Sequence, residues 1–119
     1  MSSYRIDKVE RLIKEEISLI FLQKFQDTGF GFLTITRVKV SPDLKQAKVY
    51  ISVFEKEKRE LVLDKIQLKL GFIRSELAHR VRLKFTPELR FFIDDTLDYV
   101  EKIEGLIKKI HENDNKDDK

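Results

Sequence analysis

Hydrophobic residues recur along this chain with two different periods, and the alternation between the periods predicts its helices and strands. Gaps of three and four positions, which place side chains on one helix face, run through residues 4–24 and 97–110. The longest such series runs through residues 63–81, at Leu63, Ile66, Leu70, Ile73, Leu77 and Val81. We therefore predict amphipathic helices over these three segments.

Three shorter segments alternate apolar and polar residues, as half-buried strands do. In residues 47–54 the apolar residues at odd positions alternate with Lys48, Tyr50, Ser52 and Phe54, and in residues 89–93 Leu89, Phe91 and Ile93 alternate with Arg90 and Phe92. In residues 33–40 the alternation of Leu33 and Ile35 continues at Val38 and Val40 only after a shift of one position. A β-bulge near Thr36–Arg37 returns the apolar residues to one face, so we predict a bulged first strand.

The order of these elements predicts an α+β fold, α-β-β-α-α-β-α. The first two strands form an antiparallel hairpin, and the third is reached through helix, which requires a parallel pairing with a right-handed crossover. We predict a mixed three-stranded sheet with the helices on one face. Gly71, in the middle of the helical segment 63–81, indicates a kink or a break there. Residues 1–110 are predicted to form a single domain, and 111–119 (HENDNKDDK) a disordered acidic tail.

Composition excludes most kinds of catalytic chemistry. The 119 residues contain no Cys and two His, so a disulfide framework or a metal site is not expected. Gly29-Phe30-Gly31 leads into a strand rather than a helix, and Asp94-Asp95 is explained by a helix start. No apolar run approaches the roughly 20 residues of a membrane span. We expect a cytoplasmic binding protein with no cofactor, no metal and no membrane association, not an enzyme.

Charge points to a polyanionic partner. Residues 1–93 carry 19 Lys and Arg against 12 Asp and Glu, whereas residues 94–119 carry 5 against 9. A basic body attracts nucleic-acid phosphates. The cations of the second helical segment and of the turn that follows it should form a rim. The expected RNA contacts are, in decreasing order, Arg74, Arg80, Arg82, Lys84 and Arg90, then Lys45, Lys48 and Lys69, then Arg5, Lys8 and Arg11.

Aromatic residues alternate with cations on the strands as well. Lys48 and Tyr50, like Arg90 and Phe92, should point away from the core. Rings on an open sheet either stack nucleic-acid bases or pack on one another, and the sequence leaves both alternatives open.

Three segments together, LTITRVKV, SPDLKQAKVYISV and LGFIRSELAHRVRLKFTPELRFFIDD, resemble bacterial ribosome-binding factor A over about residues 4–107. The resemblance implies a type II KH-like domain without a GXXG loop. The family's Ala-x-Gly kink corresponds to Lys69-Leu70-Gly71, with Lys in place of Ala. It further implies binding to the free 30S ribosomal subunit near the 5′-terminal helix of 16S rRNA, a part in late 30S maturation and 16S rRNA processing, and a link to growth in the cold.

Two other functions remain open. A generic KH-like RNA-binding module would bind short single strands without a role at the ribosome. A protein-docking module would use its helices to bind a partner such as a ribosome-assembly GTPase. In each case a monomer is expected.

Overall fold

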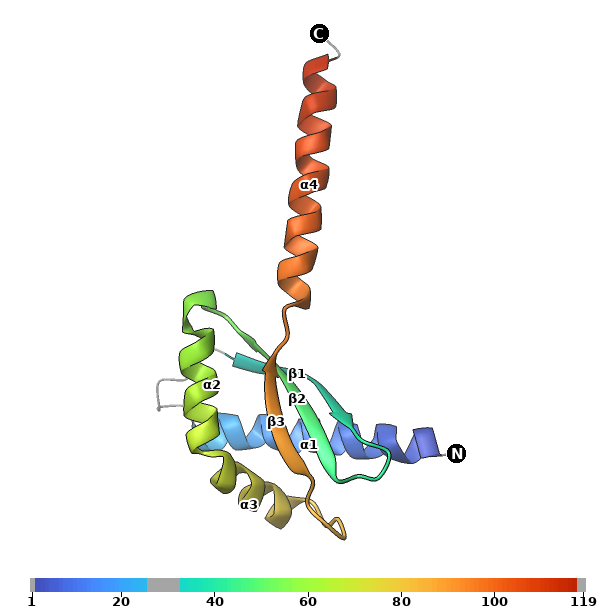
Figure 1. Cartoon of the computed structure of the whole chain (residues 1–119), viewed down its shortest axis with the longest axis vertical. Helices are drawn as coiled ribbons and strands as arrows, with labels where there is room; N and C mark the ends of the chain where they lie inside the picture. The colour runs from blue at the N-terminus through green and yellow to red at the C-terminus, as the bar shows by residue number, and fades with distance from the viewer. Residues whose placement is uncertain (1, 26–32, 118–119) are drawn as a thin grey trace.

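The computed structural model describes residues 2–25 and 33–117, and its elements follow the predicted order (Figure 1). The glycines at 29 and 31 lie outside the described residues. The elements are α1 (Ser2–Lys24), β1 (Leu33–Val40), β2 (Gln46–Val53), the short 3₁₀ helix η1 (Lys56–Lys58), α2 (Arg59–Leu68), α3 (Leu70–Arg80), β3 (Glu88–Ile93) and α4 (Thr96–Asp117).

The three strands form one mixed sheet in the order β1-β2-β3. β1 and β2 pair antiparallel, and β2 and β3 pair parallel, as predicted from the helical connection. The register of β1 shifts between Ile35 and Arg37, so the predicted bulge is confirmed. Val38 and Val40 therefore return to the buried face.

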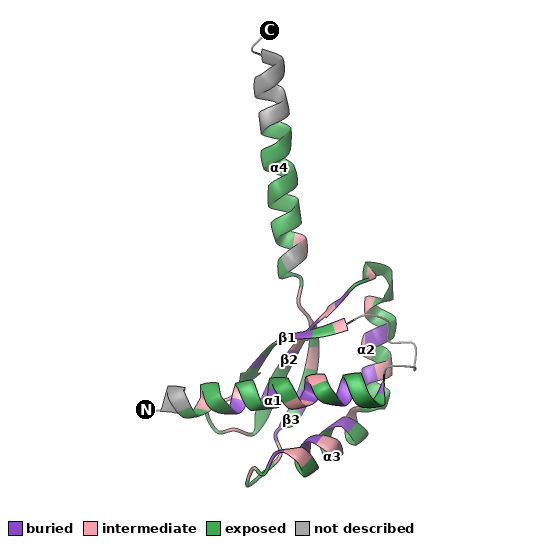
Figure 2. Cartoon of the chain, turned by 180° about the vertical axis from the view of Figure 1, so that it is seen from behind, coloured by how far each residue is buried: buried purple, intermediate pink, exposed green. Residues whose placement is uncertain are grey.

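The core lies between the sheet and the first three helices, which cover one of its faces (Figure 2). α1 crosses that face, while α2 and α3 pack beside it against β3. β-branched strand residues meet the apolar helix stripes there. Side chains with 0% relative exposure include Ile13, Ile17, Ile20, Val49, Ile51, Val62, Ile73 and Leu77. The opposite face of the sheet carries none of these helices.

The break in the second helical segment lies at Lys69, two residues before the predicted Gly71. Lys69 ends α2 and begins α3, with φ −100° and ψ 8°. Gly71 is already inside α3, and a Cβ added there would meet nothing within 4 Å. The break therefore needs no glycine, and it falls at the position that corresponds to the family's Ala.

α4 departs from the expected arrangement because it extends away from the sheet instead of covering it (Figure 1). Its apolar stripe is exposed: Val100 is 42% and Ile107 49% exposed. The helix continues to Asp117, beyond the boundary expected at residue 110.

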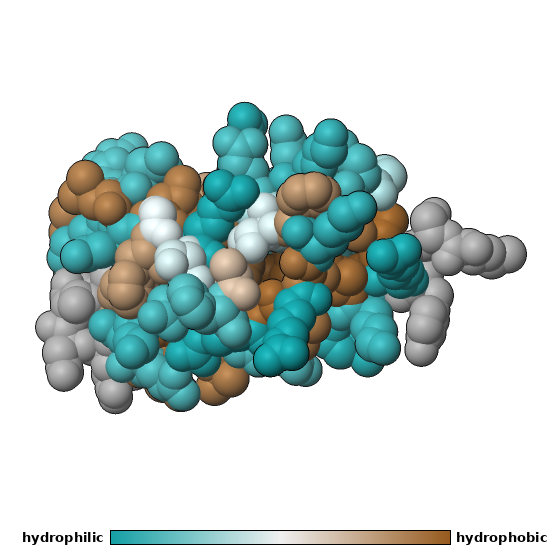
Figure 3. Space-filling view, turned by 90° about the horizontal axis from the view of Figure 1, so that it is seen from below, coloured by the Kyte–Doolittle hydropathy of each residue, from teal (hydrophilic) through white to brown (hydrophobic). Residues whose placement is uncertain are grey.

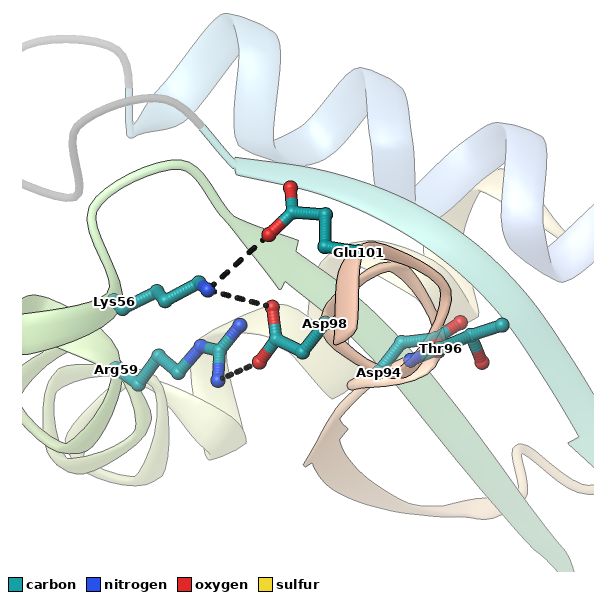
Figure 4. Close-up of polar contacts among 6 residues, drawn as sticks. All are labelled: Lys56, Arg59, Asp94, Thr96, Asp98 and Glu101. Atoms are coloured by element: carbon teal, nitrogen blue, oxygen red, sulfur yellow. Dashed lines mark hydrogen bonds and ion pairs between the residues drawn. The ribbon is translucent and has the colours of Figure 1, made fainter. Parts of the chain in front are cut away.

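The base of α4 is held to η1 and α2 by ion pairs (Figure 4). Arg59 Nη1 lies 2.6 Å from Asp98 Oδ2, and Lys56 Nζ lies 3.4 Å from both Asp98 Oδ1 and Glu101 Oε2. The hydrogen bond from Arg59, followed by the one from Lys56, lowers the pKa of Asp98. A carboxylate in the first turn also suits the positive end of the helix dipole.

Candidate nucleic-acid interface

The uncovered face of the sheet, called here the open face, displays its side chains in rows that cross all three strands. Lys39 pairs with Lys48, and Lys48 pairs with Arg90, so one cation from each strand stands in a single line. All three are exposed, and none has an ion pair with a residue of the described ranges 2–25 and 33–117. We call these three residues the cationic row.

The cationic row works against the stability of the sheet. Like charges directly opposite one another on neighbouring strands repel, and each such pair is destabilising. Two such pairs, Lys39 with Lys48 and Lys48 with Arg90, share one central side chain. A row of phosphates would remove this repulsion. The row is therefore better explained by an anionic ligand than by folding.

A second row lies two residues further along the strands. Arg37 pairs with Tyr50, and Tyr50 pairs with Phe92. The guanidinium carbon of Arg37 lies 4.4 Å from the centroid of the Tyr50 ring. The ring centroids of Tyr50 and Phe92 are 5.7 Å apart, with an interplanar angle of 31°. We call this the stacked row. Of the two alternatives left open by the sequence, mutual packing of Tyr50 and Phe92 is the one present in the free chain.

The bulge in β1 creates both rows. If β1 kept a regular alternation through Thr36, with no bulge, Arg37 and Lys39 would turn toward the core and Val38 toward solvent. The bulge was predicted from the apolar residues of the strand, and its consequence for the polar residues was not included. Arg37 and Lys39 were therefore missed as candidates, although the same one-residue shift predicts them.

Asp94, the first of the two carboxylates that follow β3, has a structural role. Thr36 Oγ1 donates to Asp94 Oδ2 at 2.6 Å, and the backbone N–H of Thr96 donates to Asp94 Oδ1 at 3.0 Å. These hydrogen bonds, the one from Thr36 foremost, lower the pKa of Asp94 to about 2. A carboxylate held ionised in this way is unsuited to general acid catalysis. Asp94 instead joins the bulge of β1, through Thr36, to the start of α4, through Thr96. Figure 4 shows Asp94 beside Thr96.

The cations of the predicted rim fall into two groups, those that contact other residues and those that are exposed without an ion pair. Arg80 Nη1 and Nε lie 3.6 Å from carboxylate oxygens of Glu16 and Glu76 respectively, and Nη2 donates to Gln23 Oε1 at 2.7 Å. Arg74 Nη2 donates to the carbonyl of Thr86 at 2.8 Å. Arg80 is thus neutralised and joins α3 to α1, which makes it a poor candidate for contact with phosphate.

The remaining members of the rim are exposed. Arg82 and Lys84 lie in the turn between α3 and β3, and Lys84 Nζ lies 5.8 Å from the centroid of the Phe85 ring. Lys69 is exposed at the break between α2 and α3. These three residues, unlike Arg80, have no ion pair with any residue of the described ranges.

The other predicted cations lie apart from both surfaces or at their margin. Lys45 is exposed in the β1–β2 loop, and its carbonyl accepts the backbone N–H of Glu88 at the start of β3. Arg5, Lys8 and Arg11 are exposed on α1, which covers the opposite face of the sheet. Charged residues are thus spread widely, and Figure 3 shows hydrophilic side chains over most of the surface seen from below. Cross-strand register distinguishes the open face from this background.

Other kinds of site find no support in the described part of the chain. Residues 2–25 and 33–117 contain no group of three His, Cys, Asp or Glu side chains able to hold a metal ion. Within the same ranges, no helix has the length and apolar character to cross a bilayer.

A mixed sheet with α1–α3 on one face, and with a break between its paired helices in place of a GXXG loop, defines a type II KH-like domain. The glycines of the chain are at 29, 31, 71 and 105, so no GXXG is present. The family model of ribosome-binding factor A matches residues 5–107. The chain belongs to the ribosome-binding factor A family.

Curated relatives and solved structures agree with this assignment. Ribosome-binding factor A of Thermodesulfovibrio yellowstonii is 42% identical over 106 residues, covering 89% of this chain and 90% of the relative. Ribosome-binding factor A of Staphylococcus epidermidis is 41% identical over 115 residues, covering 96% of this chain and 99% of the relative. The crystal structure of the Thermus thermophilus factor matches with a TM-score of 0.66 at 26% identity, covering 74% of this chain and 94% of the other.

A further match is to coordinates of the Thermus thermophilus factor that were fitted into the cryo-electron microscopy map of its complex with the 30S subunit. The TM-score is 0.56 at 28% identity, with 75% of this chain and 90% of the other covered.

Proposed function

We propose that this chain binds the free 30S ribosomal subunit in the cytoplasm and, as a monomer, assists its late maturation and the processing of 16S rRNA. Membership of the ribosome-binding factor A family supports the proposal, as does the 30S complex of the Thermus thermophilus relative. The contact with 16S rRNA lies near its 5′-terminal helix, as the resemblance implies.

The observation that carries the proposal is the cationic row, an array of three like-charged side chains with no carboxylate partner among residues 2–25 and 33–117. Arg82, Lys84 and Lys69 extend this basic surface beyond the sheet. Phosphate contacts of this kind give affinity without reading sequence.

The mechanism is steric and electrostatic. The cations hold the rRNA backbone, while the packed α+β body occupies space into which immature rRNA helices would otherwise move. No bond is made or broken. No ligand beyond RNA is required.

Co-sedimentation of the purified protein with free small subunits, large subunits and intact ribosomes tests the proposal. We expect the protein to pellet with the free 30S subunit and to remain in the supernatant with the other two particles. Equal sedimentation with all three, or with none, contradicts it. Crosslinking in the 30S pellet should then recover 16S rRNA near its 5′ end.

The exposed apolar stripe of α4 favours docking to a protein, such as a ribosome-assembly GTPase, as a second candidate function. This candidate predicts binding that survives RNase treatment and depends only weakly on salt. The RNA proposal instead predicts binding that is lost on RNase treatment and depends strongly on salt.

A further inference from the structure

The stacked row on the open face ends at Phe92, on the edge of the sheet that β3 forms. Arg37 lies over Tyr50, and Tyr50 lies against Phe92, so each strand contributes one planar group. β3 is an edge strand, and Phe92 is therefore the last member. In the described ranges, Tyr50 is the one ring recorded in contact with Phe92.

Phe92 is not required by the core. Its chain neighbour Phe91 points to the other face and packs against Phe21, with ring centroids 6.0 Å apart. Phe92 remains 38% exposed, whereas Phe21 is 8% exposed. Exposure of a phenyl ring to water is unfavourable, and this ring lies two residues from Arg90 on the same face of the same strand. An aromatic surface next to free cations is the arrangement that single-stranded nucleic acids recognise.

We propose that the open face binds single-stranded RNA, with one unpaired base stacked on Phe92 and the adjoining phosphates on the cationic row. The proposal rests on the proposed function and narrows it, because it names an unpaired segment of rRNA as the ligand of this face. The base continues the existing stack of Arg37, Tyr50 and Phe92. It therefore meets a platform whose side chains are already ordered.

The spacing of the two rows fits one nucleotide step. Side chains two residues apart on a strand are separated by about 6.8 Å, so the backbone that leaves the stacked base reaches Arg90 and Lys48 next. Every base has a π-face, so the site tolerates any sequence. Duplex RNA is excluded, because its bases are stacked on one another and its deep major groove is closed to side chains.

Binding of a short single-stranded RNA that carries 2-aminopurine tests this inference. The chain has no Trp, so fluorescence of the modified base reports stacking directly. We expect quenching on binding, and we expect Phe92→Leu to abolish the quenching and weaken binding by about 5- to 150-fold. Phe92→Tyr keeps a ring and should retain both. Phe85→Leu, which removes a ring that is 70% exposed in the α3–β3 turn, is the matched control and should behave as wild type.

Equal affinity of Phe92→Leu and wild type, with the base unquenched in both, overturns the proposal. So does binding of a duplex of the same length as tightly as the single strand. Thermal denaturation confirms that each variant is folded. Co-sedimentation with free 30S subunits separates this inference from the proposed function. Wild-type protein that pellets with the subunit but binds no single strand refutes the stacking site alone, whereas wild-type protein that does not pellet refutes the function.

Discussion

The open face of the sheet and the rim of the helices both carry cations, but contacts within the protein engage two rim arginines, whereas no member of the cationic row is paired with a carboxylate of the described ranges. On the rim, Arg80 is engaged by Glu16, Glu76 and Gln23, and Arg74 by a backbone carbonyl. On the open face, the cationic row has no carboxylate partner in the described ranges. A count of positive charge along the chain therefore does not locate the surface that binds an anion.

The difference has a geometric cause. On a helix, a carboxylate four residues from a cation lies on the same face, as Glu76 does for Arg80, and the two side chains pair. On a sheet, the nearest neighbours of an outward side chain belong to other strands, about 4.8 Å away. Register then decides the partner, and here it places Lys48 between two cations.

The largest expected effect is on the salt dependence of RNA binding, which should differ between a variant of the open face and a variant of the rim. If about six phosphates are neutralised, the logarithm of the association constant for RNA should fall with the logarithm of salt with a slope of about −4 to −5. Lys48→Gln should make this slope shallower by about 1, because one phosphate contact is lost. Arg80→Gln is the control, and its slope should equal that of wild type. Fluorescence anisotropy across a salt series measures all three, and a flat wild-type curve would rule out phosphate binding.

The next effect concerns stability. Arg80→Glu places a third carboxylate beside Glu16 and Glu76, so the free energy of unfolding should fall by about 1–2 kcal/mol. Arg82→Glu, on an exposed side chain two residues away, should leave the melting temperature unchanged and weaken RNA binding. Denaturant unfolding and anisotropy of both variants give the comparison. If Arg80→Glu weakened RNA binding and left stability unchanged, while Arg82→Glu lowered stability, Arg80 would belong to the interface.

A further prediction concerns Asp94, the carboxylate that borders the open face. Its pKa is lowered to about 2, so its hydrogen bonds stabilise the fold above the pKa of the unfolded chain, about 3.9, and are lost as pH falls toward 2. Asp94→Asn should therefore lower stability by about 1 kcal/mol at pH 7 and have a vanishing effect near pH 2. Urea unfolding at a series of pH values measures this, and a cost independent of pH would contradict the assigned ionisation.

The smallest effect has the opposite sign. Lys48→Gln relieves two like-charge pairs on the sheet, so it should raise the free energy of unfolding by about 0.2–1 kcal/mol although it weakens RNA binding. Thermal denaturation at low salt shows the gain best, because screening removes it at high salt. Loss of stability in this variant would mean that the row serves folding.

Local periodicity was enough to predict the fold up to β3. The helix stripes, the bulge near Thr36 and the parallel pairing of the last two strands all follow from the spacing of apolar residues and the length of the connection. The break at Lys69 was placed two residues late, because glycine was given more weight than the end of the hydrogen-bonded turn. α4 has a periodic stripe that the described body does not bury, and periodicity alone does not reveal what a helix packs against.

The candidate site was predicted less completely, because its residues are brought together by register. Lys48 and Arg90 were expected on one face, but their alignment with Lys39 depends on pairing between strands. The pairing of Arg80 with Glu16 joins residues from two different helices. Neither contact leaves a local signal in the sequence.

Binding of free 30S subunits by two matched double variants tests the central claim most directly. Lys48→Glu with Arg90→Glu reverses two charges on the open face, and Lys8→Glu with Arg11→Glu makes the same change of net charge on α1, which covers the other face. We predict that the first pair weakens co-sedimentation by at least about tenfold, while the second retains near wild-type binding. Equal loss in both pairs, or loss in the α1 pair alone, would contradict the assignment of the RNA interface to the open face.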